Sequence, residues 1–393
     1  MEITTSRHIY DLQFGLLCAS NFLFSASFQM IIPELPDHLT ALGGADYKGY
    51  IIALFTLTAG ISRPFSGKLT DTIGRVPIMV FGSLVCVVCS ALYPFVLTVA
   101  GFLMLRLFHG FSTGFKPTAT AAYVADVVSD NRRGEAMSAL GISSALGMSS
   151  APILGSAITE GVGFGAMCAV SSVFALLSVA ILIGKMNETL AVKQKFSLKL
   201  LKINRFEIFE PKALPPFIVQ LLVSVSSGVC LTLVPDLSKS VGISNKGLFF
   251  GISTAAALVF RIAFGRASDR YGRIIVLQWA AVSIIVSMLL IGFGTALSYT
   301  GFVVAAVIYG FGWGMNSPTL QAWTVDLVDA EHRGRGLATM FIALEAGIGL
   351  GAWLGQMLYR NDLSRIGLPF YGSAVLGGVA LVYLFFSKKI VTT

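Results

Sequence analysis

The feature of this sequence that most limits its fold is a series of long apolar segments. A helix needs about 20 apolar residues to cross roughly 30 Å of hydrocarbon. Windows of about this length recur twelve times, near residues 13–36, 46–65, 76–98, 101–128, 135–159, 163–184, 214–236, 246–264, 274–295, 299–327, 336–359 and 368–386. They are too long for barrel strands and lack strict alternation, so they predict helices that satisfy their backbone polar groups internally. The expected fold class is an all-α membrane protein with twelve transmembrane helices.

The composition agrees with this assignment and argues against an enzyme. The chain is 55% hydrophobic and 12% charged, about half the charged fraction of a soluble domain. The first apolar segment is full length and lacks an A-x-A cleavage site, which predicts a retained helix rather than a signal peptide. The five cysteines lie within predicted spans, where we expect them to pack. No Walker loop, metal-ligand cluster or Ser-His-Asp set stands apart from the helices, so we expect no catalytic residues, cofactor, metal or ATP.

The positive charge of the chain predicts its orientation. Most of its 28 Lys and Arg fall in segments that share one side of the membrane if the amino terminus is inside. The opposite loops hold Lys48, Lys239, Lys246, Arg360 and Arg365. Because cytoplasmic loops are enriched in Lys and Arg, both termini are expected to be cytoplasmic. The net charge of +8 then reflects topology, and nucleic acid is not an implied partner.

One long polar segment divides the chain into two halves. We expect an amino-terminal six-helix bundle over residues 1–185, a basic cytoplasmic linker over 186–212, and a carboxy-terminal six-helix bundle over 213–393. Leucines and phenylalanines between the linker lysines would suit a short helix on the anionic inner leaflet. The linker is interpreted as a tether between the halves, with a regulatory role as the alternative.

The two halves repeat each other at an offset of about 200 residues. The segment GKLTDTIGR at 67–75 returns as GRASDRYGR at 265–273, and IPEL at 32–35 returns as VPDL at 234–237. Arg63 matches Arg261 and Asp126 matches Asp326. Gly147, Ala151 and Gly155 match Gly347, Gly351 and Gly355. Since six helices return the chain to the same side, this is the parallel repeat found in some secondary transporters.

These motifs resemble those of the major facilitator superfamily over essentially the whole chain. The family's G-x-x-x-D-x-x-G-R loop is matched by Gly67, Asp71, Gly74 and Arg75, and again by Gly265, Asp269, Gly272 and Arg273. Its R-x-x-x-G motif appears as Arg106 and Gly110. Its antiporter motif G-x-x-x-G-P-x-x-G appears as GMSSAPILG around Pro152, with Ala151 replacing one glycine. The likeness is greatest to bacterial drug and metallophore exporters, which implies two pseudo-symmetric bundles in a bacterial inner membrane.

The duplicated charged loops predict two ionic clasps on the cytoplasmic face. Glycines permit the tight reversal between two helices and hold the acid and the arginine of each loop at the surface. Positive-inside retention alone needs no aspartates, so a gate that breaks and re-forms between two conformations is favoured over a topology signal. The candidate gate residues are Gly67, Asp71, Arg75, Asp126, Arg133, Pro152, Gly265, Asp269, Arg273, Asp326 and Arg333.

The segment 101–128 carries a polar stripe that predicts a binding wall. At 100° per residue, Arg106, His109, Thr113, Lys116, Thr120 and Tyr123 fall within an arc of about 100°. A cation at mid-bilayer costs roughly 2.5 to 3.5 kcal/mol, so Lys116 should face water or a partner rather than lipid. Arg106 lies near the outer end and could instead extend outward to the interface. His109 either titrates near neutral pH or packs through hydrogen bonds.

Glu345 is the notable intramembrane acid of the second half. It lies within FIALEAGIGLGAWLG, roughly 13 Å from the inner helix end. A carboxyl at that depth should be hard to ionise unless Lys116 or an arginine neutralises it. Glu345, with His109 as a second candidate, is therefore the predicted site of proton coupling, and a fixed structural ion pair is the alternative.

The resemblance implies a central cavity lined by the first, fourth, seventh and tenth helices. Polar side chains on these helices would form hydrogen bonds with a substrate inside a cavity with aromatic walls. Each of them could equally form hydrogen bonds between helices. The predicted substrate-binding residues are Asn21, Gln29, Arg106, His109, Thr113, Lys116, Tyr123, Gln220, Trp313, Asn316 and Gln321. Two cations and a histidine against one glutamate suggest a substrate with an anionic group, and a zwitterion is also allowed.

The sequence leads to one functional hypothesis with one alternative. The first is a monomeric secondary active exporter that exchanges protons for a small amphipathic, anionic or zwitterionic organic molecule by alternating access. The alternative is an uptake symporter or facilitator for a sugar, amino acid or organic acid, which the same fold supports. Pro152 in the antiporter motif favours the exporter. The expected partners are the substrate, protons and the lipid bilayer.

Overall fold

The chain forms a helical molecule in which the two sequence halves lie side by side. The computed structural model describes residues 12–128, 133–190, 193–202, 209–264, 267–329 and 333–391. The first half contains α1 (Leu12–Ile31), α2 (Leu35–Ala41), α3 (Lys48–Thr72), α4 (Arg75–Leu92), α5 (Val99–Val127), α6 (Arg133–Gly161) and α7 (Phe164–Lys185). The second half contains α8 (Leu214–Ser240), α9 (Leu248–Phe264), α10 (Ala267–Tyr271), α11 (Arg273–Ile291), α12 (Tyr299–Leu327), α13 (Arg333–Tyr359) and α14 (Gly367–Val391).

Every predicted span coincides with a helix, and the first span is interrupted. Pro33 and Pro36 follow α1, where a short 3-10 turn leads into α2. Within the described residues, eight helical segments are apolar and long enough to cross a membrane, and α9 is a shorter apolar helix. The 29-residue α5 is not among the eight, because it carries Arg106, His109 and Lys116. This multi-pass helical architecture agrees with the fold class expected from the sequence.

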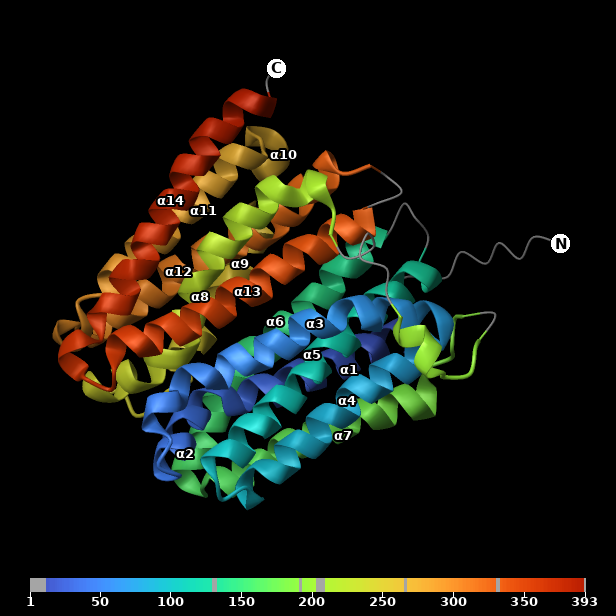
Figure 1. Ribbon diagram of the computed structural model, residues 1–393, viewed down its shortest axis with the longest axis horizontal. Helices are drawn as coiled ribbons and strands as arrows, with labels where there is room; N and C mark the ends of the chain where they lie inside the picture. Colours follow the sequence, from blue (N-terminus) through green and yellow to red (C-terminus); the bar gives the residue numbers. More distant parts are fainter. Residues whose placement is uncertain are drawn as a thin grey trace.

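Each half packs around hydrophobic side chains of its own. One core cluster consists entirely of residues from α8 to α14 and the turns between them. The main clusters of the first half lie within α1 to α7, with Ala352 of α13 joining one of them. In Figure 1 the blue and green helices form one group, and the yellow, orange and red helices form the other. The halves meet mainly where α3 packs against α13 and where α6 packs against α9.

Glycines set the closest helix contacts, and they do so at matching places in both halves. A side chain at Gly110 or Gly114 of α5 would collide with the backbone of α3 at Phe55 or Ala59. At the repeat positions, Gly310 and Gly314 of α12 bring that helix equally close to α9. The turn before α4 requires glycine at Gly74, which has φ 134°, as the turn before α11 does at Gly272, with φ 88°.

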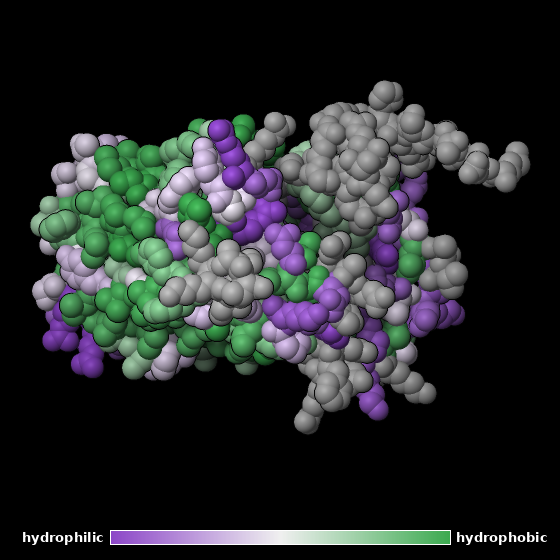
Figure 2. All heavy atoms as spheres, turned by 90° about the horizontal axis from the view of Figure 1, so that it is seen from above, coloured by the Kyte–Doolittle hydropathy of each residue, from purple (hydrophilic) through white to green (hydrophobic). Residues whose placement is uncertain are grey.

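The outside of the molecule is suited to lipid. Large apolar side chains such as Leu57, Phe108, Val375 and Phe386 are exposed on several helices. Figure 2 shows hydrophobic residues covering much of one lateral face. We call the end where α7 stops and α8 starts the linker end, and the opposite end the α2 end; both are visible in Figure 1. An apolar exterior of this kind is unfavourable in water and favourable in a bilayer.

Candidate functional site

An ion pair joins the two halves in the middle of their interface. Arg63 of α3 donates from Nη2 to Oε1 of Glu345 on α13, at 2.6 Å. The Arg63 guanidinium also lies over the ring of Phe341, 5.1 Å from its centroid. Gly60 of α3 lies beside this carboxylate side chain, and a Cβ there would lie 3.5 Å from Cβ of Glu345, an ordinary contact. Glu345 is 9% exposed, so its charge is balanced mainly by this arginine.

The structure thus supplies the partner that the sequence left open for Glu345. Sequence reasoning offered Lys116 or an arginine, and the structure selects Arg63. Arg63 stood out in the sequence only as the repeat partner of Arg261. The signal that could have identified it is an arginine in the middle of an apolar segment, because such a residue usually pairs with another charge or with backbone carbonyl groups.

Arg106 and His109 belong to a hydrogen-bonded network inside the first half. Arg106 donates from Nε to the carbonyl oxygen of Ile51 at 2.9 Å and lies over the ring of Phe55. Tyr93 bridges the two, with its hydroxyl 3.3 Å from Nη1 of Arg106 and 3.2 Å from Nδ1 of His109. Arg106 is 1% exposed. The alternative that it extends outward to the interface is therefore wrong.

Lys116 is held by hydroxyl and carbonyl oxygens of two other helices. Its Nζ lies 2.9 Å from the carbonyl oxygen of Ser20 on α1 and 2.5 Å from Oγ of Ser178 on α7. The ring of Phe24 lies 4.6 Å from Nζ. Lys116 is 0% exposed, so it faces polar partners and not lipid. None of these partners is a carboxylate, and none lies in the second half.

The polar stripe of α5 therefore does not form a wall facing the second half. Arg106, His109 and Lys116 contact α1, α3, α4, α7 and the turn after α4. The physical reason is the tight contact through Gly110 and Gly114, which places α5 against α3 and directs the neighbouring polar side chains into the bundle. A periodicity argument defines an arc but does not say which neighbouring helix that arc faces.

The other predicted substrate-binding residues take varied positions. Asn21 joins α1 to α6, with Nδ2 2.6 Å from Oγ of Ser144. Three others bond within their own helix: Thr113 to Gly110, Gln220 to Ser224 and Gln321 to Ser317. Gln29, Tyr123 and Asn316 are buried, and Trp313 is half-buried beside Tyr309.

The charged loops form one cluster at the linker end of each half. In the first, which we call the N-clasp, Arg75 contacts Asp71 at 3.1 Å and Asp126 at 3.0 Å. In the second, the C-clasp, Arg273 contacts Asp269, and contacts Asp326 at 2.9 Å. Arg75 thereby ties the turn between α3 and α4 to the end of α5. In the same way, Arg273 ties the turn before α11 to the end of α12. The side chains of Arg133 and Arg333, and all of Gly265, lie outside the described residues.

Sequence reasoning missed that the start of the linker joins the N-clasp. Both carboxylate oxygens of Glu188 accept backbone N–H groups at the start of α4, from Arg75 at 2.9 Å and from Val76 at 3.1 Å. The hydroxyl of Thr189 donates to Asp126 at 2.6 Å. A carboxylate at a helix amino terminus is electrostatically favourable, so this part of the linker is anchored to the first half.

The α2 end carries reciprocal ion pairs between the halves. Lys48 of α3 contacts Asp236 of α8 at 2.6 Å, and Lys246, just before α9, contacts Glu34 at 2.5 Å. Lys246 also contacts Asp37 at 2.7 Å, and Lys239 joins the same aspartate. We call these six residues the rim network. Glu34 and Asp236 occupy matching positions of the repeat, as do Lys48 and Lys246. Each half therefore supplies the acid of one bridge and the lysine of the other.

Other contacts close the same end. Gln356 of α13 donates to the carbonyl oxygen of Ala45 at 3.2 Å, and Asn361 donates to Asp46 at 2.9 Å. A side chain at Gly247 would collide with the backbone at Pro152, so α6 and the start of α9 touch directly. Pro152, a predicted gate residue, therefore lies at the interface of the halves, near their α2 end.

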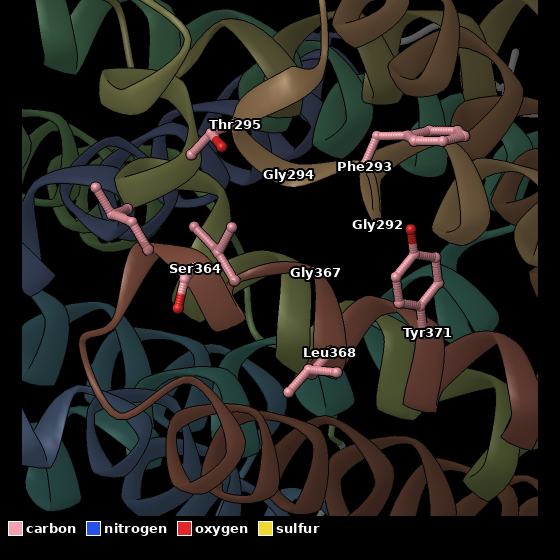
Figure 3. Close-up of a pocket in the computed structure, with 10 residues that line it drawn as sticks. Gly292, Phe293, Gly294, Thr295, Ser364, Gly367, Leu368 and Tyr371 are labelled. Carbon is pink, nitrogen blue, oxygen red and sulfur yellow. The ribbon is translucent and has the colours of Figure 1, made fainter.

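A surface pocket in the second half contains none of the predicted residues. It lies between the turn after α11 and the start of α14, and is lined by residues that include Phe293, Thr295, Ser364 and Tyr371. Figure 3 shows these side chains around the opening, with only Thr295, Ser364 and Tyr371 presenting hydroxyl groups among those labelled. With no charged side chain in its lining, this pocket has no group to hold an ion or to exchange a proton.

Comparisons with known proteins agree with this architecture. The family model described as Major Facilitator Superfamily matches residues 17–209 and 216–391. The multidrug resistance protein 2 of Bacillus subtilis (strain 168) is 24% identical over 392 residues, covering 96% of both chains. The multi-drug resistance efflux pump PmrA homolog of Lactococcus lactis is 26% identical, over 91% of this chain and 88% of the relative.

Solved structures share the fold. The human organic anion transporter MFSD10 (TETRAN) superimposes with a TM-score of 0.70 at 18% identity, covering 94% of this chain and 98% of that one. A peptide transporter POT in complex with sulfate superimposes with a TM-score of 0.76 at 14% identity, covering 94% of this chain and 93% of that one. At these identities the likeness concerns the fold alone.

Proposed function

Because this chain belongs to the major facilitator superfamily, whose members are membrane transporters and not enzymes, we propose that it is a proton-coupled exporter of a small organic molecule. The proposed substrate is an amphipathic compound with an anionic or zwitterionic group. Two relatives that cover most of the chain are named as multidrug resistance proteins or efflux pumps, which supports export. The antiporter motif around Pro152 supports the same direction.

The Arg63–Glu345 pair carries the proposal. It is a buried pair that bridges the halves through α3 and α13, at 2.6 Å. When Glu345 takes up a proton, its attraction to Arg63 is lost, and the two helices are no longer held together by opposite charges. Arg63 is then available to an anionic group. Proton uptake is thereby coupled to a change in the contact between the halves, as exchange of protons for substrate requires.

The rim network and the two clasps supply the two-state element. Closure at the α2 end rests on reciprocal pairs between the halves, and alternating access requires that end to open while the other closes. Each clasp ties a turn to its own half, and it breaks and re-forms between the two conformations. We assign the linker end, with both chain termini, to the cytoplasmic side of a bacterial inner membrane.

We also propose an oligomeric state, domain boundaries and a role for the linker. The functional unit is a monomer, since one chain supplies both six-helix halves. The domain boundaries are residues 1–185, 186–212 and 213–393. The linker is a tether between them, and the pairing of Glu188 with the start of α4 supports anchorage of its first residues to the amino-terminal half.

Proton coupling is tested by replacing Glu345 in the full-length protein. In proteoliposomes with an imposed pH gradient, wild-type protein should drive a candidate organic anion against the direction of proton flow. Glu345→Gln removes the titratable carboxyl but keeps its shape, so flux should persist down a substrate gradient and lose its dependence on pH. Glu160→Gln is the matched control, because Glu160 is exposed at the end of α6, and its flux should follow the wild type.

Two outcomes would contradict the proposed function. If Glu345→Gln keeps the wild-type response to the pH gradient, proton coupling at this carboxylate is wrong. If protons and substrate move in the same direction in the wild type, the protein is a symporter and the exporter assignment fails.

A further inference from the structure

Arg261 is a half-buried arginine of α9 that has no acidic partner among the residues that the structure describes. Its Nε is buried and has no hydrogen-bond partner within the described part of the chain. Among the described side chains, no carboxylate forms an ion pair with it. It lies where α9 packs against α6, and a Cβ at Gly141 of α6 would be 3.9 Å from its Nη1. The guanidinium therefore stands at the interface of the halves beside a residue without a side chain.

Arg261 is the repeat partner of Arg63, and the comparison shows what it lacks. Arg63 packs on Phe341 and pairs with Glu345, both on α13. The corresponding helix α6 starts at Arg133, as α13 starts at Arg333. At this offset of about 200, Phe341 corresponds to Gly141 and Glu345 to Ala145. The ring and the carboxylate that complete the first site are both replaced by small residues in the second.

The replacement leaves a charge without its usual compensation. A guanidinium away from bulk water is costly unless an anion or hydrogen-bond acceptors face it. Arginine offers a planar fork that binds a carboxylate through two parallel hydrogen bonds and also stacks on aromatic rings. At the contact between α3 and α13, Arg63 makes both of these contacts at once.

We propose that Arg261, with Gly141 and Ala145, is a binding site for an aromatic carboxylate. The ligand's carboxylate takes the position that Glu345 holds beside Arg63, and its ring takes the position of Phe341. This inference rests on the proposed transport function and specifies its substrate class. The site lies between α6 and α9, so a bound ligand contacts both halves, as a transported molecule must.

The test measures equilibrium binding of 1-naphthoate to the full-length protein in nanodiscs. Scintillation proximity with radiolabelled 1-naphthoate reports saturable binding, and empty nanodiscs give the background from lipid. Neutral 1-naphthamide serves as the probe that lacks the charge. We expect naphthamide to bind at least 10-fold more weakly than naphthoate, because it leaves the guanidinium without an anion.

Four substitutions, one of them a control, separate the roles of the residues. Arg261→Gln should weaken naphthoate binding at least 10-fold, and Arg261→Lys should retain part of the affinity, since it keeps the charge without the fork. Ala145→Glu should weaken binding at least 10-fold, because the new carboxylate occupies Arg261 as Glu345 occupies Arg63. Ala145→Gln is the matched control of the same size, and its binding should stay closer to that of the wild type.

The proposal is overturned by any of three results. These are no saturable naphthoate binding to the wild type, naphthamide binding as tight as naphthoate, or wild-type affinity in both Arg261→Gln and Ala145→Glu. Retained thermal stability of Ala145→Glu shows that a loss of binding is not a loss of fold. No gradient is applied, so intact binding without proton-driven flux refutes only the coupling mechanism, and proton-driven flux without naphthoate binding refutes only this site.

Discussion

Lys116 shows how this protein accommodates a cation at the centre of a bundle. Its amino group is surrounded by Ser20 and Ser178, whose hydroxyls also lie 2.8 Å from each other. The Phe24 ring adds a favourable contact with the charge. Because the lysine joins α5 to α1 and α7 at once, its role in the structure is to connect three helices of the first half.

Removing one acceptor from this site should destabilise the protein. Ser178→Ala leaves the buried ammonium with fewer partners, at a cost of about 1 to 3 kcal/mol. Lys116→Met, which removes the charge but keeps the length, should cost less, because Ser20 and Ser178 can still bond to each other. Thermal unfolding followed by the reactivity of the buried native cysteines measures both.

The comparison with an exposed serine completes that experiment. Ser150 bonds only within its own helix and is exposed, so Ser150→Ala should unfold as the wild type does. A Ser178→Ala protein as stable as Ser150→Ala would contradict the account of Lys116.

The sequence predicted the constraint on Lys116 but not its partners. A charged residue amid apolar ones excludes lipid on energetic grounds alone. The choice of Ser20 and Ser178 depends on how α5 is rotated against α1 and α7, which periodicity along one helix does not determine. The same limit explains why the acceptor of Arg106, a backbone carbonyl of Ile51, could not be inferred.

At the scale of elements, the close approach of helix pairs controls the fold. Gly110 and Gly114 place α5 on α3, and their repeats Gly310 and Gly314 place α12 on α9. In the sequence these glycines recur at an offset of 200 residues. Their spacing of four predicts one helix face, whereas the identity of the opposing helix comes only from the structure. Likewise, the prolines at 33 and 36 mark the break between α1 and α2, which hydropathy alone merges into one span.

A larger residue at Gly110 should force α5 away from α3. Gly110→Val adds atoms that collide with the carbonyl of Phe55, and overpacking of this kind costs typically about 1 to 3 kcal/mol. The displacement should also disturb Arg106 and its bond to Ile51. Thermal unfolding in detergent micelles measures the loss of stability.

Gly15 provides the control for that substitution. A Cβ at Gly15 of α1 meets nothing within 4 Å, so Gly15→Ala should be neutral or slightly stabilising, as glycine is a poor helix former. If Gly110→Val unfolds at the wild-type temperature, the close contact between α5 and α3 is not a determinant of stability.

At the scale of the whole molecule, the halves are joined by charges that the sequence showed only as repeats. Glu34 and Asp236 were aligned in the sequence, but Lys246 lies more than 200 residues from Glu34, and nothing in one sequence specifies which distant charges meet. The duplication predicts two similar bundles. It does not predict that each acid pairs with the lysine of the opposite half.

Closure of the α2 end should weaken at alkaline pH. Burial alone would lower the pKa of Lys246, but hydrogen bonds to Asp37 and Glu34 outweigh it and raise this pKa above its ordinary value. The closed state is therefore favoured by this lysine below its ordinary pKa of about 10.4, and that contribution is lost as the pH rises through the raised value. Spin labels at Ala41→Cys and Ser244→Cys, on exposed positions of opposite halves, measure the distance across the end.

The variant Lys246→Gln isolates the titrating group. Its label distance should be longer than that of the wild type at neutral pH and should respond less to alkaline pH. A wild-type distance in Lys246→Gln at neutral pH would mean that the rim network does not hold the end closed.

The reciprocal form of the rim network bears on how the molecule arose. Each half carries an acid near the end of its first long helix and a lysine at the start of its second, so one half presents a surface complementary to a copy of itself. That is the geometry of an isologous dimer, in which a twofold axis makes every contact twice. Two identical six-helix chains in such a dimer would form the same two ion pairs across the end that they share. A gene fusion would then join the two chains into one protein.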